Sequence, residues 1–225
     1  MKRITILLAE DHTIVREGVR MLLQLEKDLR IVGEAADGRQ AVALVKKLRP
    51  NVVLMDIALP LLNGMEATRQ IRKDYPGTKV LILSAHSHAA FIQKATELGA
   101  AGFLLKQTSS AVLATAIREV QKGNTFFSPG IVRPGPSRDP KSQAGGKPGE
   151  PKGNRLSSRE VEVLQLIAEG QANKQVAAQL GVTFKTVDKH RQHLMSKLNI
   201  HDVAGLTRYA MAEGIIESND WAPVE

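Results

Sequence analysis

The sequence of 225 residues contains no cysteine. This absence excludes a disulfide framework, a thiol nucleophile and a cysteine-ligated metal, and it favours the reducing cytoplasm as the setting. No apolar run approaches the ~20 residues that a membrane-spanning helix needs. The apolar stretch after Met1-Lys2-Arg3 is short and is followed by Glu10-Asp11, which does not fit a signal peptide. We therefore expect a cytoplasmic protein with no membrane partner.

The chain has an excess of basic residues, with 31 Lys and Arg against 23 Asp and Glu, a net charge of +8. A basic chain favours nucleic acid as a partner. The excess is unevenly placed, because residues 154–225 hold eight basic and nine acidic side chains. Within residues 170–200, however, five basic side chains accompany a single acidic one. The informative signal is therefore this local basic patch and not the net charge.

Proline and glycine are concentrated in one segment, SPGIVRPGPSRDPKSQAGGKPGEPKG at residues 128–153. Such a segment cannot bury enough apolar surface to offset the entropy of ordering it, so we predict a flexible linker. The alternative is a long functional loop inside one domain. The predicted organisation is a first domain, a linker, a second domain and a tail, at residues 1–125, 126–153, 154–217 and 218–225.

In the first domain, short apolar runs alternate with longer stretches of helical spacing. The runs are Ile4-Thr5-Ile6-Leu7-Leu8, Ile31-Val32-Gly33, Val52-Val53-Leu54-Met55, Val80-Leu81-Ile82-Leu83 and Gly102-Phe103-Leu104-Leu105. Continuous apolar strands separated by helices indicate a parallel sheet that is covered on both faces. The pattern therefore predicts an α/β doubly wound fold with five parallel strands, of the flavodoxin-like class.

Polar residues follow the predicted strands, where ligands bind in a doubly wound sheet. They are Glu10, Asp11, Asp56, Ser84 and Lys106. Each alone has an ordinary explanation as a helix cap, a solvated strand end or a turn residue. Together they place three carboxylates, a hydroxyl and an ammonium at one edge. Carboxylates this close repel one another unless a cation neutralises them, and oxygen ligands suit Mg²⁺. An Asp in such a site is a competent nucleophile toward phosphorus.

These residues lie in LLAEDH at 7–12, VVLMDIALPLLNGMEA at 52–67, LILSAH at 81–86 and GAAGFLLK at 99–106. The pattern resembles the receiver domain of two-component response regulators. The resemblance implies that Asp56 accepts a phosphoryl group from a sensor histidine kinase. The Mg²⁺ ligands it implies are Glu10, Asp11, Asp56 and the backbone carbonyl of Ala58. Lys106 would pair with the phosphoryl oxygens, Ser84 would move to bond them, and Phe103 would turn inward as an aromatic switch.

After the linker the strand signal disappears, and apolar residues recur every three or four positions, which predicts an all-helical domain. Two helices joined at Leu180-Gly181-Val182 form a predicted helix-turn-helix, whose second helix enters the major groove of DNA. On that helix one side is polar and mostly basic, at Lys185, Asp188, Lys189 and Gln192. A solvated helix face gives the same pattern, so spacing alone leaves both interpretations open.

The motifs LSSREVEVLQLIAEG, NKQVAAQLGV, TVDKH and SKLNI within residues 154–217 resemble the LuxR-type four-helix DNA-binding domain. With the receiver they give the NarL/FixJ arrangement of response regulator. The candidate DNA contacts are Lys174, Lys185, Asp188, Lys189, His190, Arg191, Gln192 and Lys197. Of these we expect Lys174, Arg191 and Lys197 at phosphates. The family commonly has lysine at position 188, and an Asp there either accepts from cytosine N4 or repels a phosphate. His190 could instead be packed on the helix.

By the same resemblance, Val203, Leu206 and Met211 are candidates for dimerisation, although packing within the domain explains them equally well. The sequence therefore predicts a transcription factor that binds double-stranded DNA, forms a homodimer when phosphorylated or DNA-bound, and is not an enzyme beyond its own phosphorylation and slow dephosphorylation. A rival phosphohydrolase would need a second carboxylate two residues after Asp56, where the chain has Ala58. A second rival is a receiver whose helical domain binds protein or RNA.

Overall fold

The computed structural model describes residues 3–85, 87–131 and 156–216. The chain divides into two compact units, residues 1–145 and 146–225, and each is described by itself. Most of the predicted linker and all of the predicted tail lie outside the described residues. Within those residues, none of the helices has the length and apolar character needed to cross a membrane.

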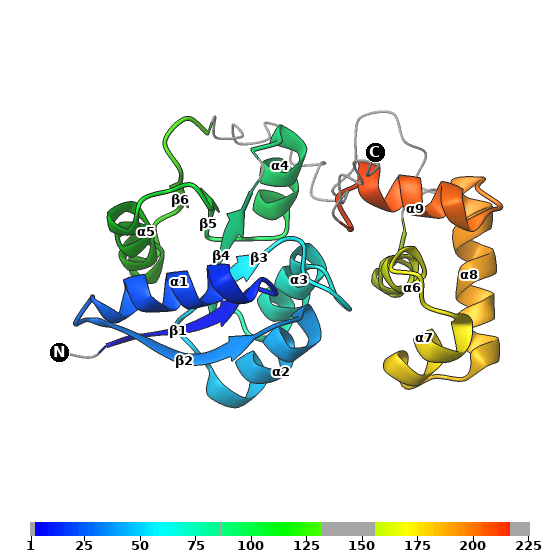
Figure 1. The fold of residues 1–225 in the computed structure, drawn as a ribbon, viewed down its shortest axis with the longest axis horizontal. Helices are drawn as coiled ribbons and strands as arrows, with labels where there is room; N and C mark the ends of the chain where they lie inside the picture. The colour runs from blue at the N-terminus through cyan, green and yellow to red at the C-terminus, as the bar shows by residue number, and fades with distance from the viewer. Residues whose placement is uncertain (1–2, 86, 132–155, 217–225) are drawn as a thin grey trace, which may run out of the picture. The chain divides into compact units, whose positions relative to one another are not determined.

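The first unit is a parallel sheet with strand order β2-β1-β3-β4-β5-β6 and helices on both sides (Figure 1). The strands are β1 (Ile4–Ala9), β2 (Leu29–Ala35), β3 (Val52–Asp56), β4 (Lys79–Ser84), β5 (Gly102–Leu105) and β6 (Phe126–Phe127). The helices are α1 (Thr13–Gln24), α2 (Gly38–Leu48), α3 (Gly64–Asp74), α4 (Ala89–Glu97) and α5 (Ser110–Lys122). The predicted doubly wound α/β fold is confirmed.

Alternate residues of each strand point to opposite faces of the sheet, and both faces are buried. Leu7, Val53 and Ile82 face a core that α2, α3 and α4 complete. Their strand neighbours Leu8 and Leu54 face a second core that α1 and α5 complete. Burial on both faces is why the strands read as continuous apolar runs and not as an alternation.

The sheet has a sixth strand, which corrects the predicted count of five and the predicted end of the domain at residue 125. Phe126 and Phe127 pair in parallel with Gly102 and Phe103 of β5. Ser128 is buried, and its hydroxyl accepts a hydrogen bond from the backbone N–H of Leu105 at 3.0 Å. Residues 126–128 therefore belong to the first unit and not to the linker. Two apolar residues are too few to carry the periodicity that identifies a strand.

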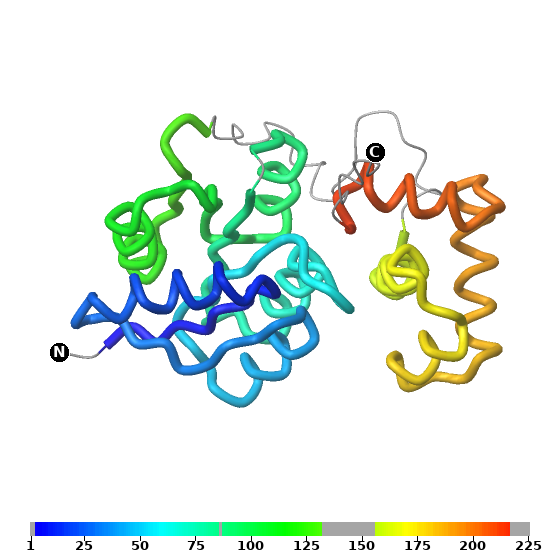
Figure 2. Tube along the Cα trace, viewed as in Figure 1, coloured from blue at the N-terminus to red at the C-terminus, as the bar shows by residue number. Residues whose placement is uncertain are grey.

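The second unit is all-helical within residues 156–216, as predicted. Its helices are α6 (Ser158–Ala168), α7 (Asn173–Leu180), α8 (Phe184–Leu198) and α9 (Val203–Ala212). The helix α6 packs against both α8 and α9, while α7 packs against α8 (Figure 2). Gly181 ends α7 at φ 62°, a left-handed conformation that glycine adopts without strain. The predicted glycine turn of the helix-turn-helix is therefore confirmed.

Candidate functional site

The structure brings Glu10, Asp11, Asp56 and Lys106 together at the carboxyl end of the strands. Glu10 and Asp11 follow β1, Asp56 ends β3, and Lys106 follows β5. The ammonium Nζ of Lys106 lies 2.9 Å from Asp56 Oδ2 and 2.9 Å from Glu10 Oε2. These residues are distant in sequence, and they meet because parallel strands that share a sheet end at the same edge.

The cluster holds three carboxylates and one ammonium, and two of the carboxylates are shielded from water. The side chains of Glu10 and Asp56 are 1% and 2% exposed, and that of Lys106 is 17% exposed. Burial and the neighbouring Asp56 raise the pKa of Glu10, although Lys106 opposes this. Burial alone would lower the pKa of Lys106, but Asp56 and Glu10 outweigh it and the net direction is upward. Lys106 is therefore charged at neutral pH.

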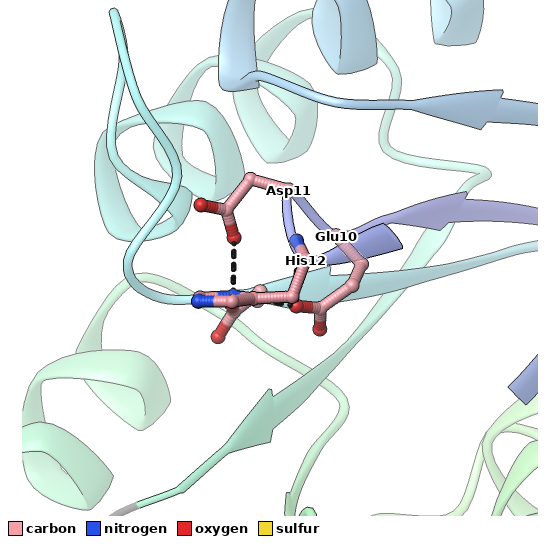
Figure 3. A group of neighbouring side chains, drawn as sticks. Glu10, Asp11 and His12 are labelled. Atoms are coloured by element: carbon pink, nitrogen blue, oxygen red, sulfur yellow. Dashed lines mark hydrogen bonds and ion pairs between the residues drawn. The ribbon is translucent and has the colours of Figure 1, made fainter. Parts of the chain in front are cut away.

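His12 belongs to this cluster, although sequence reasoning gave it no role. Its ring nitrogen Nδ1 lies 2.9 Å from Asp11 Oδ1 and 3.2 Å from Glu10 Oε1 (Figure 3). Asp11 is the largest cause of the raised pKa of His12. The signal that could have found this residue is its position directly after the acidic pair, in the loop that leads into α1.

The donor set fits a divalent metal ion. One ligand atom from each of Glu10, Asp11, His12 and Asp56 lies within 4.8 Å of the others. Asp11 Oδ1 is buried and accepts no hydrogen bond, although His12 Nδ1 is close to it. Closely spaced carboxylate oxygens are where a hard cation would sit, and carboxylates with few nitrogen donors suit Mg²⁺. The backbone carbonyl of Ala58 as a further ligand stays a prediction.

The loop after β3 holds Asp56 in place. The backbone N–H of Ile57 donates to Asp56 Oδ1 at 2.7 Å. Gly64 begins α3 directly against Asp56, and a Cβ on Gly64 would lie 1.8 Å from the backbone oxygen of Asp56. Only glycine permits this approach. Asn63 caps α3 by accepting from the backbone N–H of Glu66 at 2.9 Å. The close approach of Gly64 to the backbone of Asp56 explains why glycine occupies this position.

Two further predicted residues, Ser84 and Phe103, are buried in the first unit. Ser84 ends β4 and is 3% exposed, and its backbone carbonyl accepts from the N–H of Lys106 at 2.7 Å. Phe103 is completely buried in the core that α2, α3 and α4 complete. The sequence interpretation had Phe103 turn inward on phosphorylation. The structure corrects the expected position of Phe103 before phosphorylation, because the ring already lies in the protein core. A ring without a hydroxyl group needs no polar partner there.

In the second unit, the polar side of α8 is open to solvent. Lys185, Lys189 and Gln192 are exposed, and Asp188 is partly exposed between them. The amide Nε2 of Gln192 donates to Asp188 Oδ2 at 3.0 Å. Val187 lies on the opposite side and is completely buried. The predicted groove-binding face is therefore accessible to solvent, and on it the acidic Asp188 lies between the basic Lys185 and Lys189.

Lys197 and Arg191 already have partners within this unit. Lys197 Nζ lies 2.7 Å from Glu160 Oε2, which itself accepts from the backbone N–H of Ser157 in the capping box of α6. Arg191 Nη1 donates to Asn173 Oδ1 at 3.2 Å. These contacts compete with the phosphate contacts predicted for both residues. Lys174 is exposed near the start of α7, and His190 is partly buried.

The structure divides the three dimerisation candidates. Leu206 is completely buried inside the second unit, so the alternative of packing within the domain holds for it and it is no longer a dimerisation candidate. A helix that packs on one side shows an apolar repeat whether or not a partner subunit exists, which is why spacing alone could not separate the two roles. Val203 and Met211 are 43% and 37% exposed, and they remain candidates.

We expect Glu160→Gln to destabilise the second unit by about 1 kcal/mol at pH 7, because it removes the charge from the hydrogen bond with Lys197. Burial raises the pKa of Glu160, but the hydrogen bonds from Lys197 and Ser157 outweigh it and the net pKa is lowered. A lowered carboxylate pKa stabilises the fold above the unfolded value of 4.5 and ceases to do so as the pH falls through the folded value.

Urea unfolding of the full chain at pH 7 and at about pH 3 measures this difference, which is expected only at pH 7. Glu213→Gln, which changes an exposed carboxylate directly after α9, is the matched control. An equal loss for Glu160→Gln at both pH values would show that the charge of Glu160 is not what stabilises the unit.

Comparisons with known proteins agree with both units. Residues 6–118 match the family described as "Response regulator receiver domain", and residues 154–210 match "Bacterial regulatory proteins, luxR family". The transcriptional regulatory protein DegU of Brevibacillus brevis is 33% identical over 99% of this chain and 96% of its own length. The response regulator VraR of Staphylococcus aureus is 33% identical over 95% of this chain and 99% of its own. The structure of a complex of the response regulator RcsB with DNA is 26% identical over 94% of this chain and 99% of that chain, with a TM-score of 0.55.

Proposed function

The chain belongs to the NarL/FixJ family of response regulators, which join a receiver domain to a LuxR-type DNA-binding domain and regulate transcription, and from this premise we propose that phosphorylation of Asp56 controls its binding to DNA. The observation that carries the proposal is the pairing of buried Asp56 with Lys106 at 2.9 Å, beside Glu10 and Asp11. A structural ion pair would need one carboxylate, whereas this site gathers three, two of which pair with the Lys106 ammonium.

The phosphoryl donor is a phosphohistidine of a sensor histidine kinase. A carboxylate oxygen of Asp56 forms the new bond to phosphorus as the bond from phosphorus to the histidine nitrogen breaks. Lys106 offsets the charge that gathers on the phosphoryl oxygens. Mg²⁺ held by Glu10, Asp11, Asp56 and the carbonyl of Ala58 would supply further positive charge. The N–H of Ile57 keeps the Asp56 carboxylate oriented throughout.

The helix α1 is the surface on which we place the kinase. Because its phosphohistidine must come within bonding distance of Asp56, the kinase has to cover the carboxyl edge of the sheet, where α1 begins. Two exposed apolar side chains of α1, Ile14 (84%) and Met21 (64%), share a helical spacing with Leu25 (79%), the residue that caps the end of α1. Exposed apolar groups at the spacing of one helix face fit a helical partner better than solvent.

Phosphorylation adds nearly two negative charges and several acceptor oxygens at Asp56. We propose that the hydroxyl of Ser84 turns to donate to these oxygens. The packing around Phe103 would then change, and with it the surface formed by α4, β5 and α5. This is a local change of charge that biases a two-state element, and Phe103 acts in it as part of the core.

The chain uses this chemistry as a switch and not to turn over a metabolite. It would catalyse its own phosphorylation and the slow hydrolysis of its aspartyl phosphate. The position two residues after Asp56 is Ala58, so it offers no carboxylate to act as a general acid or base. A slow return to the unphosphorylated state lets the signal persist.

We further propose that α8 enters the major groove of double-stranded DNA. The exposed Lys185, Lys189 and Gln192 would contact base edges or the groove, and Lys174 would contact a phosphate. The solved complex of RcsB with DNA supports this placement, because that chain aligns with nearly the whole of this one.

Phosphorylation is expected to convert a monomer to a homodimer, because two linked binding domains gain affinity through their raised local concentration. Size-exclusion chromatography with light scattering, with and without beryllofluoride as a phosphoryl mimic, measures the mass. The result we expect is a doubled mass with the mimic. An unchanged mass would instead favour activation by release of the DNA-binding domain within one chain.

A further inference from the structure

Phe184, the first residue of α8, is the largest exposed apolar side chain among the described residues of the DNA-binding domain. Within residues 156–216 the exposed large apolar side chains are Phe184, Val203 and Met211, and Phe184 is the most exposed at 58%. It lies outside the polar set that the helix-turn-helix pattern singles out. Single exposed apolar side chains are common on protein surfaces, so the exposure of Phe184 gains meaning only from its position on α8.

The position of Phe184 on α8 indicates which group its ring would contact. Residues four apart share a helix face, so Phe184 lies beside Asp188, which in turn lies beside Gln192. The carboxylate of Asp188 accepts a hydrogen bond from Gln192 and would be repelled by DNA phosphates. An acidic side chain on this edge of α8 is compatible with base edges, where the amino groups of cytosine and adenine donate.

The first turn of α8, which would enter the groove, has a capped N-terminus. The hydroxyl of Thr183 accepts from the backbone N–H of Thr186 at 3.2 Å and caps the helix directly before Phe184. In helix-turn-helix proteins, it is the N-terminal residues of the second helix that meet base edges. The only apolar group that a base pair presents in the major groove is the 5-methyl of thymine.

We propose that Phe184 is a specificity-determining residue whose ring contacts the methyl group of a thymine in the major groove. The inference rests on the proposed DNA binding by α8 and adds the chemistry of one recognised base. In this arrangement the lysines of the face attract DNA electrostatically. Asp188 would accept a hydrogen bond from a base amino group, and Phe184 would make an apolar contact with a methyl group. Burial of one methyl group contributes about 0.8 kcal/mol, which is about a fourfold difference in affinity.

The test begins with selection of bound duplexes from a random pool by the full chain carrying beryllofluoride. Each thymine of the selected half-site is then replaced in turn by deoxyuridine, which removes only the methyl group. For the native chain we expect one thymine whose replacement weakens binding about fourfold. For Phe184→Ala the two duplexes should bind equally well, and Phe184→Leu should keep part of the preference. Lys174→Ala, a change at a predicted phosphate contact, should weaken both duplexes alike and keep the fourfold ratio.

An unchanged thymine preference in Phe184→Ala, with folding verified by circular dichroism, would overturn the inference and leave DNA binding intact. So would a native chain that distinguishes no thymine from deoxyuridine. Failure of the native chain to enrich any duplex would instead overturn the proposed DNA binding, and the role of Phe184 with it.

Discussion

Asp56→Asn is expected to abolish phosphorylation of the chain by a small phosphodonor such as acetyl phosphate. The amide of Asn lacks the negative charge that makes a carboxylate oxygen nucleophilic toward phosphorus. It also removes the ion pair that Lys106 makes with Asp56 at 2.9 Å. Intact-mass measurement after incubation with donor and Mg²⁺ should show one added phosphoryl group on the native chain and none on the variant.

The matched control for this substitution is Asp74→Asn, which changes an exposed carboxylate at the end of α3 in the same domain. It should take up the phosphoryl group as the native chain does. Circular dichroism should show that Asp56→Asn is folded, because the substitution relieves repulsion with the buried Glu10. Undiminished uptake by a folded Asp56→Asn variant would refute the assignment of the phosphoacceptor.

Lys189→Ala is expected to weaken specific DNA binding strongly and to leave phosphorylation unchanged. Lys189 is exposed on the polar side of α8, and no acidic partner of it is described. A direct base contact is worth about 1–3 kcal/mol, so a dimer that loses two of them should bind its selected duplex about 30-fold or more weaker. Gel shifts at several salt concentrations measure the loss for specific and unrelated duplexes.

Lys73→Ala, which removes an exposed lysine of α3 in the receiver domain, is the control for the change in net charge. It should bind the selected duplex as the native chain does. If Lys189→Ala kept its affinity for that duplex, α8 would not be the recognition helix. If it lost phosphorylation as well, the division of the chain into a switch and a separate output would be wrong. Binding of RNA in preference to duplex DNA would favour the rival output domain.

The fold and the acidic cluster could be predicted because both depend on the order of residues along the chain. Strands that are buried on both faces give continuous apolar runs, and the residues that follow parallel strands meet at one edge. Glu10, Asp56 and Lys106 were found in this way. The strand β6 was missed because two residues show no period, and His12 was missed because one side chain beside an acidic pair carries no spacing signal.

The roles of residues on the helices could not be predicted to the same depth. Helical spacing predicts on which side of a helix a residue lies, but it does not predict which group that residue contacts. Leu206 belongs to the core, and Lys197 is paired with Glu160. Arg191 is bonded to Asn173. The basic patch at residues 170–200 thus presents a smaller set of exposed cations than its composition implies: Lys174, Lys185 and Lys189.

The central claim is that phosphorylation of Asp56 controls DNA binding, and one measurement tests it most directly. The affinity of the native chain for its selected duplex is measured with Mg²⁺ before and after treatment with acetyl phosphate, alongside Asp56→Asn. The two sites are coupled if phosphorylation raises the native affinity, and we expect a rise of about tenfold. We expect no change for Asp56→Asn. An equal affinity of the native chain in both states, or an equal rise in Asp56→Asn, would contradict the account.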